Sequence, residues 1–422
     1  MKVKKIAFKH FRGFKNLAID FDPTMNVLIG INGAGKSSIL EGIAVLLSRV
    51  SAAVISAKAL GRQFSENDIK NGEKSTNNHI TIEFDEQDYQ WNVAKTRKGK
   101  PPLEFSSLHG AKVVAEFIQN RLNDQPEASI PLLVYYPVNR AVLDIPLKIR
   151  KKHIFDQLTA YDGALTGVEN NFRVFFEWFR NREDIENELF RKSREDSLFT
   201  HHPFQPDPQL AAVRTVISAF LPGFAKPRIQ RQPLRMTIEK DGHELIINQL
   251  SDGEKCLLAM VGDLARRLAM THPDLANPLH GHGIVLIDEI DLHLHPDWQR
   301  RILPTLARTF PNCQFILSTH SPQVVSEVQA ESIWMIALEP PVAIHPDGAY
   351  GLDTNRILED VMHVAERPEA IKTRLGELFS QIHAGELHTA RQGLQQLLAD
   401  IGDDPELTKA AVLIRRKEII GK

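Results

Sequence analysis

The chain has little of what marks a secreted or membrane protein. Its 422 residues include only two cysteines, Cys256 and Cys313, both in apolar surroundings, so disulfide bonds are not expected. No 18-residue apolar run is evident, and no apolar stretch follows the lysines at the amino terminus. These absences argue against a leader peptide and a membrane span, and they predict a cytoplasmic protein without a membrane partner.

Neither sign of charge dominates. The 51 basic residues are matched by 53 acidic ones, which gives a formal net charge of -2 at pH 7. A global field that attracts nucleic acid is therefore not expected. Local basic clusters remain at residues 2–15, 95–100 and 148–153. Each could line a DNA path, although a solvated face is the commoner role of any one such cluster.

A phosphate-binding loop lies near the amino terminus. Residues 30–37 match the pattern GxxxxGK followed by Ser or Thr, in which glycines let backbone N–H groups curl around phosphates. The apolar run 26–29 predicts a buried strand before the loop, and residues 38–47 predict a helix after it, as phosphate binding requires. Lys36 would hold the β- and γ-phosphates and Ser37 the metal. The predicted nucleotide-binding residues of this segment are Asn32, Gly33, Ala34, Gly35, Lys36, Ser37 and Ser38.

The residues that would complete a hydrolytic site follow in chain order. The apolar strand predicted at 284–287 ends in Asp288 and Glu289, as expected where one acid supports Mg²⁺ and the next polarises water. A second predicted strand, 313–318, leads to His320, which could contact a γ-phosphate directly or through water. We therefore predict Asp288 as a metal-side residue and Glu289 as the general base.

Residues 250–255 form a further motif that would complete the ATP site. Ser251 lies 214 positions after Ser37. The segment resembles the signature motif of ABC-type ATPases, with Asp252 where a second glycine is more usual. The resemblance implies that Ser251 and Gly253, with Glu254 beside them, close over a nucleotide held by another subunit. A homodimer with two composite ATP sites follows from it.

The same resemblance implies the fold and the remaining roles. The fold would be α/β, an ABC-type P-loop NTPase head with a mixed β-sheet core, an antiparallel β lobe, a helical lid insertion and a C-terminal helical extension. The cofactors would be ATP and Mg²⁺. Asp288 and Glu289 would be Walker B and its catalytic glutamate, Asp291 would lie in the D-loop, and His320 would be the switch histidine.

The amino terminus narrows the family. Residues 6–21 resemble the opening strand pair of RecF, SMC-type and OLD-type proteins, which runs directly into Walker A. By that similarity Arg12 and Lys9 would lie near the nucleotide; a basic, solvated strand face is the alternative. A transporter subunit fits less well, because 37 residues separate Ser251 from Asp288 and no coupling to a membrane partner is evident.

The segment between the two motif blocks contains no long coiled coil. Residues 77–105 alternate in polarity and predict antiparallel hairpins, and 131–136 predict a further core strand. Residues 150–196 become helical and amphipathic, without the sustained heptads of an SMC-type arm. The predicted domains are a first ATPase lobe at 1–149, a helical lid at 150–209, a second lobe at 210–349 and a helical extension at 350–422.

Two residue groups have both a structural and a functional interpretation. The aromatic residues within 172–179 could stack on bases, because aromatics interleaved with arginines bind single strands, but their helical spacing favours packing. His293 and His295 could ligate zinc, but no cysteine or further histidine stands nearby in sequence to complete four ligands. We favour packing for the first group and the D-loop for the second.

The carboxy terminus is predicted to be helical. After a strand at 332–336, helices are expected at 370–384, 387–401 and 404–421, with glycines between them as caps. The tail is short for a nuclease domain and has no strand signal, so cutting of nucleic acid would require another subunit. We expect a helical hairpin that docks on the head or on a partner.

The chain lacks a coiled coil and a nuclease domain, and in this it resembles the PtuA-like ATPases of Septu and retron antiphage systems. Residues 350–362, before the helical tail, carry part of the same resemblance. The resemblance implies a bacterial defence ATPase that dimerises head to head, forms higher oligomers, and regulates an HNH nuclease partner. A reverse transcriptase with its nucleic acid, or DNA, is a further implied partner. A RecF-like repair clamp that binds DNA directly, a transporter subunit, and a nucleotide sensor with negligible turnover remain alternatives.

Overall fold

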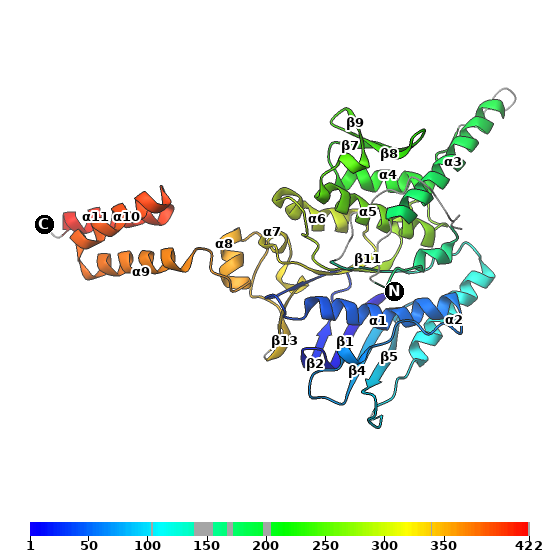
Figure 1. Cartoon of the computed structure of the whole chain (residues 1–422), viewed down its shortest axis with the longest axis horizontal. Helices are drawn as coiled ribbons and strands as arrows, with labels where there is room; N and C mark the ends of the chain where they lie inside the picture. The colour runs from blue at the N-terminus through cyan, green and yellow to red at the C-terminus, as the bar shows by residue number, and fades with distance from the viewer. Residues whose placement is uncertain (103, 139–154, 167–171, 197–203, 339, 421–422) are drawn as a thin grey trace. The chain divides into compact units, whose positions relative to one another are not determined.

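A computed structural model shows the chain as two compact units, Met1–Thr354 and Asn355–Lys422 (Figure 1). The structure describes residues 1–102, 104–138, 155–166, 172–196, 204–338 and 340–420. The basic cluster predicted at 148–153 lies outside these residues, as do parts of the lid predicted at 150–209. Both cysteines are free and buried, which confirms that no disulfide forms between them.

The first unit is built on a six-stranded sheet in the order β13-β12-β3-β11-β10-β6. All of its strands run parallel except the edge strand β13, and all the strands predicted from apolar runs are present. Parallel strands place their carboxyl ends at one edge of a sheet, so the segments after β3, β10 and β11 meet there. The strands are β3 (Met25–Ile29), β6 (Leu132–Tyr136), β10 (Gly283–Ile287), β11 (Cys313–Ser318), β12 (Ile333–Leu338) and β13 (Pro341–Ile344).

A second, antiparallel sheet forms the lobe predicted from the alternating segments. Its order is β2-β1-β4-β5, and α1 lies between it and the six-stranded sheet (Figure 1). Gly42 of α1 allows close packing, because a Cβ there would come within 2.6 Å of the Phe8 ring. The elements are β1 (Lys2–Phe11), β2 (Phe14–Asp20), α1 (Lys36–Ile55), β4 (Ser75–Phe84), β5 (Gln87–Thr96) and α2 (His109–Asp124).

Helix α1 corrects one expectation. It is the single helix in the described part of the chain that is long and apolar enough to cross a membrane, whereas no such run was predicted. Yet 72% of its 18-residue apolar window is buried inside the protein, as in the core helix of a globular unit. A helix that is apolar on all sides needs burial on all sides, and two sheets supply it here.

Helices cover the other face of the six-stranded sheet, and a small three-stranded sheet packs on α4 and α3 (Figure 1). The aromatic residues predicted at 172–179 are at most 6% exposed, which confirms packing and leaves no face for base stacking. The three-stranded sheet before the signature was not predicted. These elements are α3 (Phe172–Asp196), α4 (Pro208–Phe220), β7 (Phe224–Arg231), β8 (Leu234–Lys240), β9 (His243–Ile246), α5 (Asp252–Thr271), α6 (Pro296–Thr309) and α7 (Pro322–Val325).

The second unit contains the three predicted helices. They are α9 (Glu369–Ala384), α10 (Leu387–Ile401) and α11 (Pro405–Ile420), preceded by the short α8 (Thr354–Arg356). Their apolar residues form a core of their own, separate from that of the first unit. Gly385 ends α9 in the left-handed conformation, with φ 82°, as a glycine cap does.

Candidate nucleotide site

The phosphate loop connects β3 to α1 at the carboxyl edge of the six-stranded sheet. Gly33 and Gly35 have φ of 80° and 97°, a region that favours glycine. A Cβ on Gly35 would also come within 2.4 Å of the Phe14 ring. No side chain in the described part of the chain caps the start of α1. The first N–H groups of a 20-residue helix therefore remain available to an anion, and they fit a phosphate group.

Lys36 lies inside this loop. Its Nζ donates hydrogen bonds to the carbonyl oxygens of Gly30 and Ile31, at 2.8 and 3.2 Å, and the residue is 6% exposed. Burial lowers the pKa of Lys36, and the carboxylates of Asp288 and Glu289 act against that shift without cancelling it. The ammonium group therefore lies in the electrostatic reach of the predicted catalytic acids, next to the predicted phosphate position.

Ser318, at the end of β11, holds the two predicted acids in place. Its hydroxyl donates a short hydrogen bond to Asp288 Oδ1 and accepts one from the backbone N–H of Glu289, at 2.8 Å. Glu289 has φ 48°, an uncommon conformation that costs about 1–3 kcal/mol and persists only where the surrounding structure imposes it. The bonds to Ser318 impose it here, and they fix the point at which the chain turns away from Asp288.

The D-loop and the switch segment are joined by two side chains. Asp291 Oδ1 accepts a hydrogen bond from Thr319 Oγ1 at 2.5 Å and another from the backbone N–H of His320 at 3.3 Å. Gln299, in the first turn of α6, donates to the carbonyl oxygen of Leu294 at 2.9 Å and accepts from Ser321 Oγ at 2.7 Å. Asp291 and Gln299 thereby hydrogen-bond residues on both sides of His320.

Arg12 lies beside the start of α1. It contacts Ser38 Oγ at 3.3 Å, Glu41 at 2.6 Å and Asp68 at 2.8 Å. Burial lowers the pKa of Arg12, but the hydrogen bonds and charges of Glu41 and Asp68 raise it by more, so that the pKa of Arg12 lies above its ordinary value. Lys9 instead pairs with Glu104 at 2.5 Å. Of the two cations predicted near the nucleotide, Arg12 is therefore the one in contact with a predicted nucleotide-binding residue.

The signature segment forms the start of α5. Ser251 caps the helix: its hydroxyl accepts from the Glu254 N–H at 3.4 Å, and Glu254 Oε2 accepts from the Ser251 N–H at 2.8 Å. Burial raises the pKa of Glu254, but bonds from Lys240 and Ser251 lower it overall. Gly253 is required by a close approach, because a Cβ there would lie 2.2 Å from the His293 carbonyl oxygen.

The residues present fit ATP and Mg²⁺. The loop N–H groups and Lys36 suit phosphates, while the Ser37 hydroxyl and the Asp288 carboxylate are oxygen ligands of the kind Mg²⁺ prefers beside phosphate oxygens. Among the described residues no group of three His, Cys, Asp or Glu side chains is arranged to hold a metal, so the zinc interpretation gains no support. His295 instead caps α6, accepting from the Asp297 N–H.

Several residues of the site were not predicted. Glu41, Asp68 and Gln299 are polar residues without a motif, and only the fold brings them to Arg12 and the D-loop. The pairing of Ser251 with Glu254 could have been recognised, because Ser-x-x-Glu before an apolar helix is a capping-box pattern.

Comparison with known proteins gives consistent matches. The family described as RecF/RecN/SMC N terminal domain matches residues 2–339. The chain is 31% identical to the Retron Ec83 probable ATPase of Escherichia coli, across 96% of this chain and 85% of that protein. It is 34% identical to the Retron Vc95 probable ATPase of Vibrio cholerae serotype O1 biovar El Tor, across 80% and 73%. It is 26% identical to the Septu protein PtuA of Bacillus mycoides (strain KBAB4), across 76% and 38%.

Proposed function

Because the chain belongs to the RecF/RecN/SMC family and is related to retron ATPases, we propose that it is an ATPase of bacterial antiphage defence that controls a partner nuclease. The predicted relationship to this family is confirmed by these matches. One observation carries the ATPase proposal. Lys36 lies at the start of α1, where no side chain caps the helix, and it interacts electrostatically with Asp288 and Glu289.

The mechanism assigns each step to a residue of this chain. The loop N–H groups and Lys36 bind and orient the phosphates. Ser37 and Asp288 would hold Mg²⁺, which supplies charge neutralisation at the phosphates when bound. Glu289 takes a proton from the attacking water, and His320 orients the γ-phosphate.

The site is completed in trans in this proposal. Ser251 and Gly253 begin α5, where the helix N-terminus favours a negative group. We place them over the γ-phosphate bound by a second copy, so that ATP binding closes a head-to-head dimer and hydrolysis opens it. The partner nuclease would respond to the difference between the closed and the open dimer. We expect this nuclease to be of the HNH class and both proteins to act in the cytoplasm.

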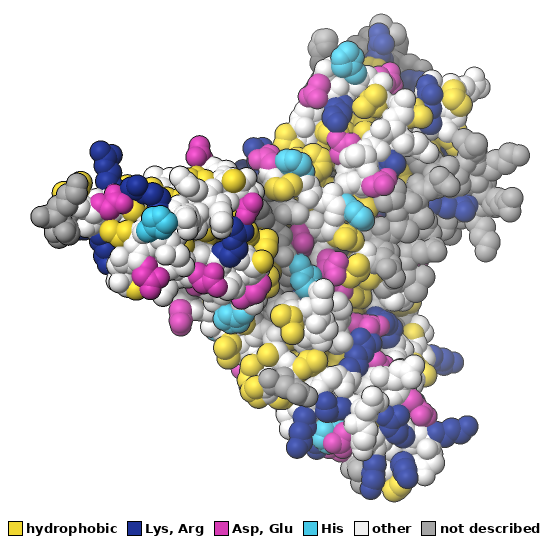
Figure 2. Space-filling model, turned by 60° about the vertical axis from the view of Figure 1, so that its left-hand side comes forward, with side chains coloured by type: hydrophobic (Ala, Val, Ile, Leu, Met, Phe, Trp, Pro, Cys, Tyr) yellow, Lys and Arg dark blue, Asp and Glu magenta, His cyan; other side chains and the backbone are white. Residues whose placement is uncertain are grey.

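A DNA clamp is the weaker candidate. Basic side chains gather over the antiparallel lobe at the lower end of the molecule, but acidic ones are interspersed with them (Figure 2). Three lysines of the 2–15 cluster are already paired, Lys4 with Asp88 at 3.0 Å, and Lys5 and Lys9 with other carboxylates. Pairing leaves this face less able to neutralise phosphates.

Two substitutions test the ATPase. Lys36→Ala should abolish ATP binding, because it removes the charge that holds the phosphates. Glu289→Gln should keep binding and lose hydrolysis, trapping the closed dimer. Equilibrium binding of a fluorescent ATP analogue and phosphate release measure the two, with the exposed Glu331→Gln as a control that should change neither. Equal binding by both variants would sink the assignment.

A further inference from the structure

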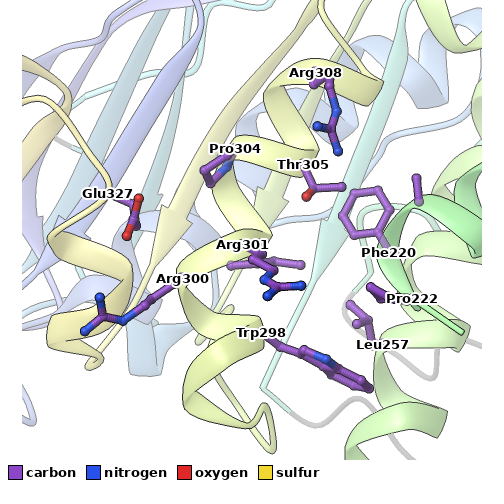
Figure 3. Close-up of a pocket in the computed structure, with 12 residues that line it drawn as sticks. Phe220, Pro222, Leu257, Trp298, Arg300, Arg301, Pro304, Thr305, Arg308 and Glu327 are labelled. Carbon is purple, nitrogen blue, oxygen red and sulfur yellow. The ribbon is translucent and has the colours of Figure 1, made fainter.

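A pocket beside α6 lies outside the nucleotide site. It has a volume of about 470 Å³ and is formed by α4, α5, α6 and the turn after α7. Arg301, Thr305 and Arg308 of α6 face Phe220 and Leu257 across it, and Trp298 closes one end (Figure 3). Phe220 and Leu257 are at most 5% exposed, so their packed side chains form an apolar floor with arginines at the rim.

The walls of this pocket continue the segments that sense nucleotide. Helix α6 follows the D-loop, Leu257 lies on α5 after the signature, and Glu327 follows the switch segment. Gln299 stands between two pocket residues, Trp298 and Arg300, and bonds Leu294 of the D-loop and Ser321. A ligand in the pocket therefore contacts elements that a change of nucleotide state would move.

The side chains that line the pocket carry an excess of positive charge. The lining carries three arginines, Arg300, Arg301 and Arg308, and one carboxylate, Glu327. Arg301 pairs at 3.3 Å with Asp297, and both of these side chains are more than half exposed. Within the part of the chain that the structure describes, Arg300 and Arg308 have no ion-pair partner. The pocket is thus complementary to a carboxylate-bearing ligand with an apolar portion.

The spacing of the arginines defines that ligand further. Arg301 and Arg308 are seven positions apart on α6, which at about 1.5 Å per residue separates them by about 10 Å along the helix. Side chains of an extended peptide alternate between its two faces, so two acids on one face are an even number of positions apart. Four positions span about 13 Å, at about 3.3 Å per residue, and the long arginine side chains reach across the difference. The apolar floor lies between the two arginines, so an apolar side chain midway between the two acids, on the same face of the peptide, would reach it.

We propose that this pocket is the docking site for an extended peptide segment of the partner nuclease, with two acids four positions apart and an apolar side chain midway between them. The inference rests on the proposed function for the identity of the partner. Nucleic acid fits less well, because single strands bind along extended basic grooves with several exposed rings. Here the lining holds two aromatic rings among the residues that the structure describes, Trp298 and the buried Phe220.

Fluorescence anisotropy of a labelled peptide tests this site on the full chain. The probe has the sequence Gly-Gly-Glu-Gly-Trp-Gly-Glu-Gly-Gly, and a scrambled probe has its two glutamates adjacent. We expect saturable binding of the first probe and weakening by roughly tenfold or more in Arg301→Glu/Arg308→Glu, because both complementary charges are reversed. Arg415→Glu/Arg416→Glu, a matched pair of exposed arginines in the second unit, should bind as the unchanged chain does.

Each other outcome overturns the proposal. Equal binding by the two double variants, or equal binding of the scrambled probe, would remove the pocket from recognition. A labelled oligothymidylate that binds through Arg301 and Arg308 while the peptide does not would make the site a nucleic-acid contact. A shift to monomers in Arg301→Glu/Arg308→Glu on size exclusion would make it an interface between copies. Lys36→Ala should still bind the probe, which separates failure of this proposal from failure of the ATPase assignment.

Discussion

Replacing Asp263 by asparagine tests how the signature helix is anchored. Asp263 lies on α5 and accepts hydrogen bonds from Arg266 Nη2 at 2.6 Å, Arg267 Nε at 2.7 Å and the Tyr136 hydroxyl at 3.1 Å. Burial would raise the pKa of Asp263, but Arg267 and Arg266 lower it to about 2. The backbone carbonyl oxygen of Tyr136 in turn accepts a hydrogen bond from the backbone N–H of Asp288 at 2.8 Å, so β6 connects this cluster on α5 to the end of β10.

The magnitude follows from burial. The side chains of Arg266 and Arg267 are 2% and 7% exposed, so the asparagine would remove the one carboxylate with which both buried guanidinium groups pair. Removing one partner of a buried ion pair costs ~3–5 kcal/mol. An unfolding entropy of ~2.1 cal/mol/K per residue, applied to the 354 residues of the first unit, converts ~4 kcal/mol into a fall in Tm of about 5 °C.

Thermal unfolding by near-UV circular dichroism measures the fall. Asp297→Asn is the matched control, because Asp297 and Arg301 form the same i,i+4 pair on an exposed helix face. An exposed pair of that kind contributes ~0.3–0.5 kcal/mol, so the control should shift Tm by less than about 1 °C. Equal shifts in the two variants would refute the reasoning that burial, and not the pairing itself, sets the cost.

Three further predictions concern other parts of the first unit. Burial lowers the pKa of His272 to about 4 and of His282 to about 3. In the unfolded chain each histidine has a pKa of about 6.5, so below that pH the unfolded chain binds more protons than the folded protein does. The free energy of unfolding is therefore highest above about pH 6.5 and falls by ~2 kcal/mol per histidine at about pH 5. The His272→Gln/His282→Gln variant should show a flatter dependence of Tm on pH between about 7.5 and 5, and an unchanged slope would contradict this. Gly253→Ala should lose most ATPase activity, because its Cβ would lie 2.2 Å from the His293 carbonyl oxygen and push back the start of α5; wild-type phosphate release would contradict it. Gln299→Met should keep ATP binding and slow hydrolysis by about tenfold or more, because the D-loop loses its tie to the switch segment, and an unchanged kcat would disprove that coupling.

The strands that carry the site were predictable because they are apolar and end in motif residues. β3, β10 and β11 are buried on both faces, and such strands appear in a sequence as short continuous apolar runs. β9 and β13 were not predicted: β9 begins with two polar residues, and the short apolar run of β13 starts at Pro341, directly after Pro340, where prolines favour a turn. Their pairing with β8 and β12 is what makes them strands.

The site was predictable where one segment supplies the chemistry. The residues of the phosphate loop and Asp288 with Glu289 are local patterns, so the sequence alone indicates their roles. Contacts between distant segments were not predictable: Arg12 meets Asp68 across 56 positions. The sequence shows that Arg12 is basic, whereas only the fold shows which acids hold it.

Mixing two inactive variants tests the central claim, that each ATP site is completed by a second copy. Lys36→Ala removes phosphate binding but keeps the signature. Ser251→Asp keeps a good helix cap at α5 while its charge repels the γ-phosphate. Each variant alone should be inactive in phosphate release. Co-expressed with separate tags, the two should recover roughly a quarter of the unchanged activity, because half of the dimers are mixed and each mixed dimer has one intact site. No recovery in the mixture, or full activity of Ser251→Asp alone, would contradict the account.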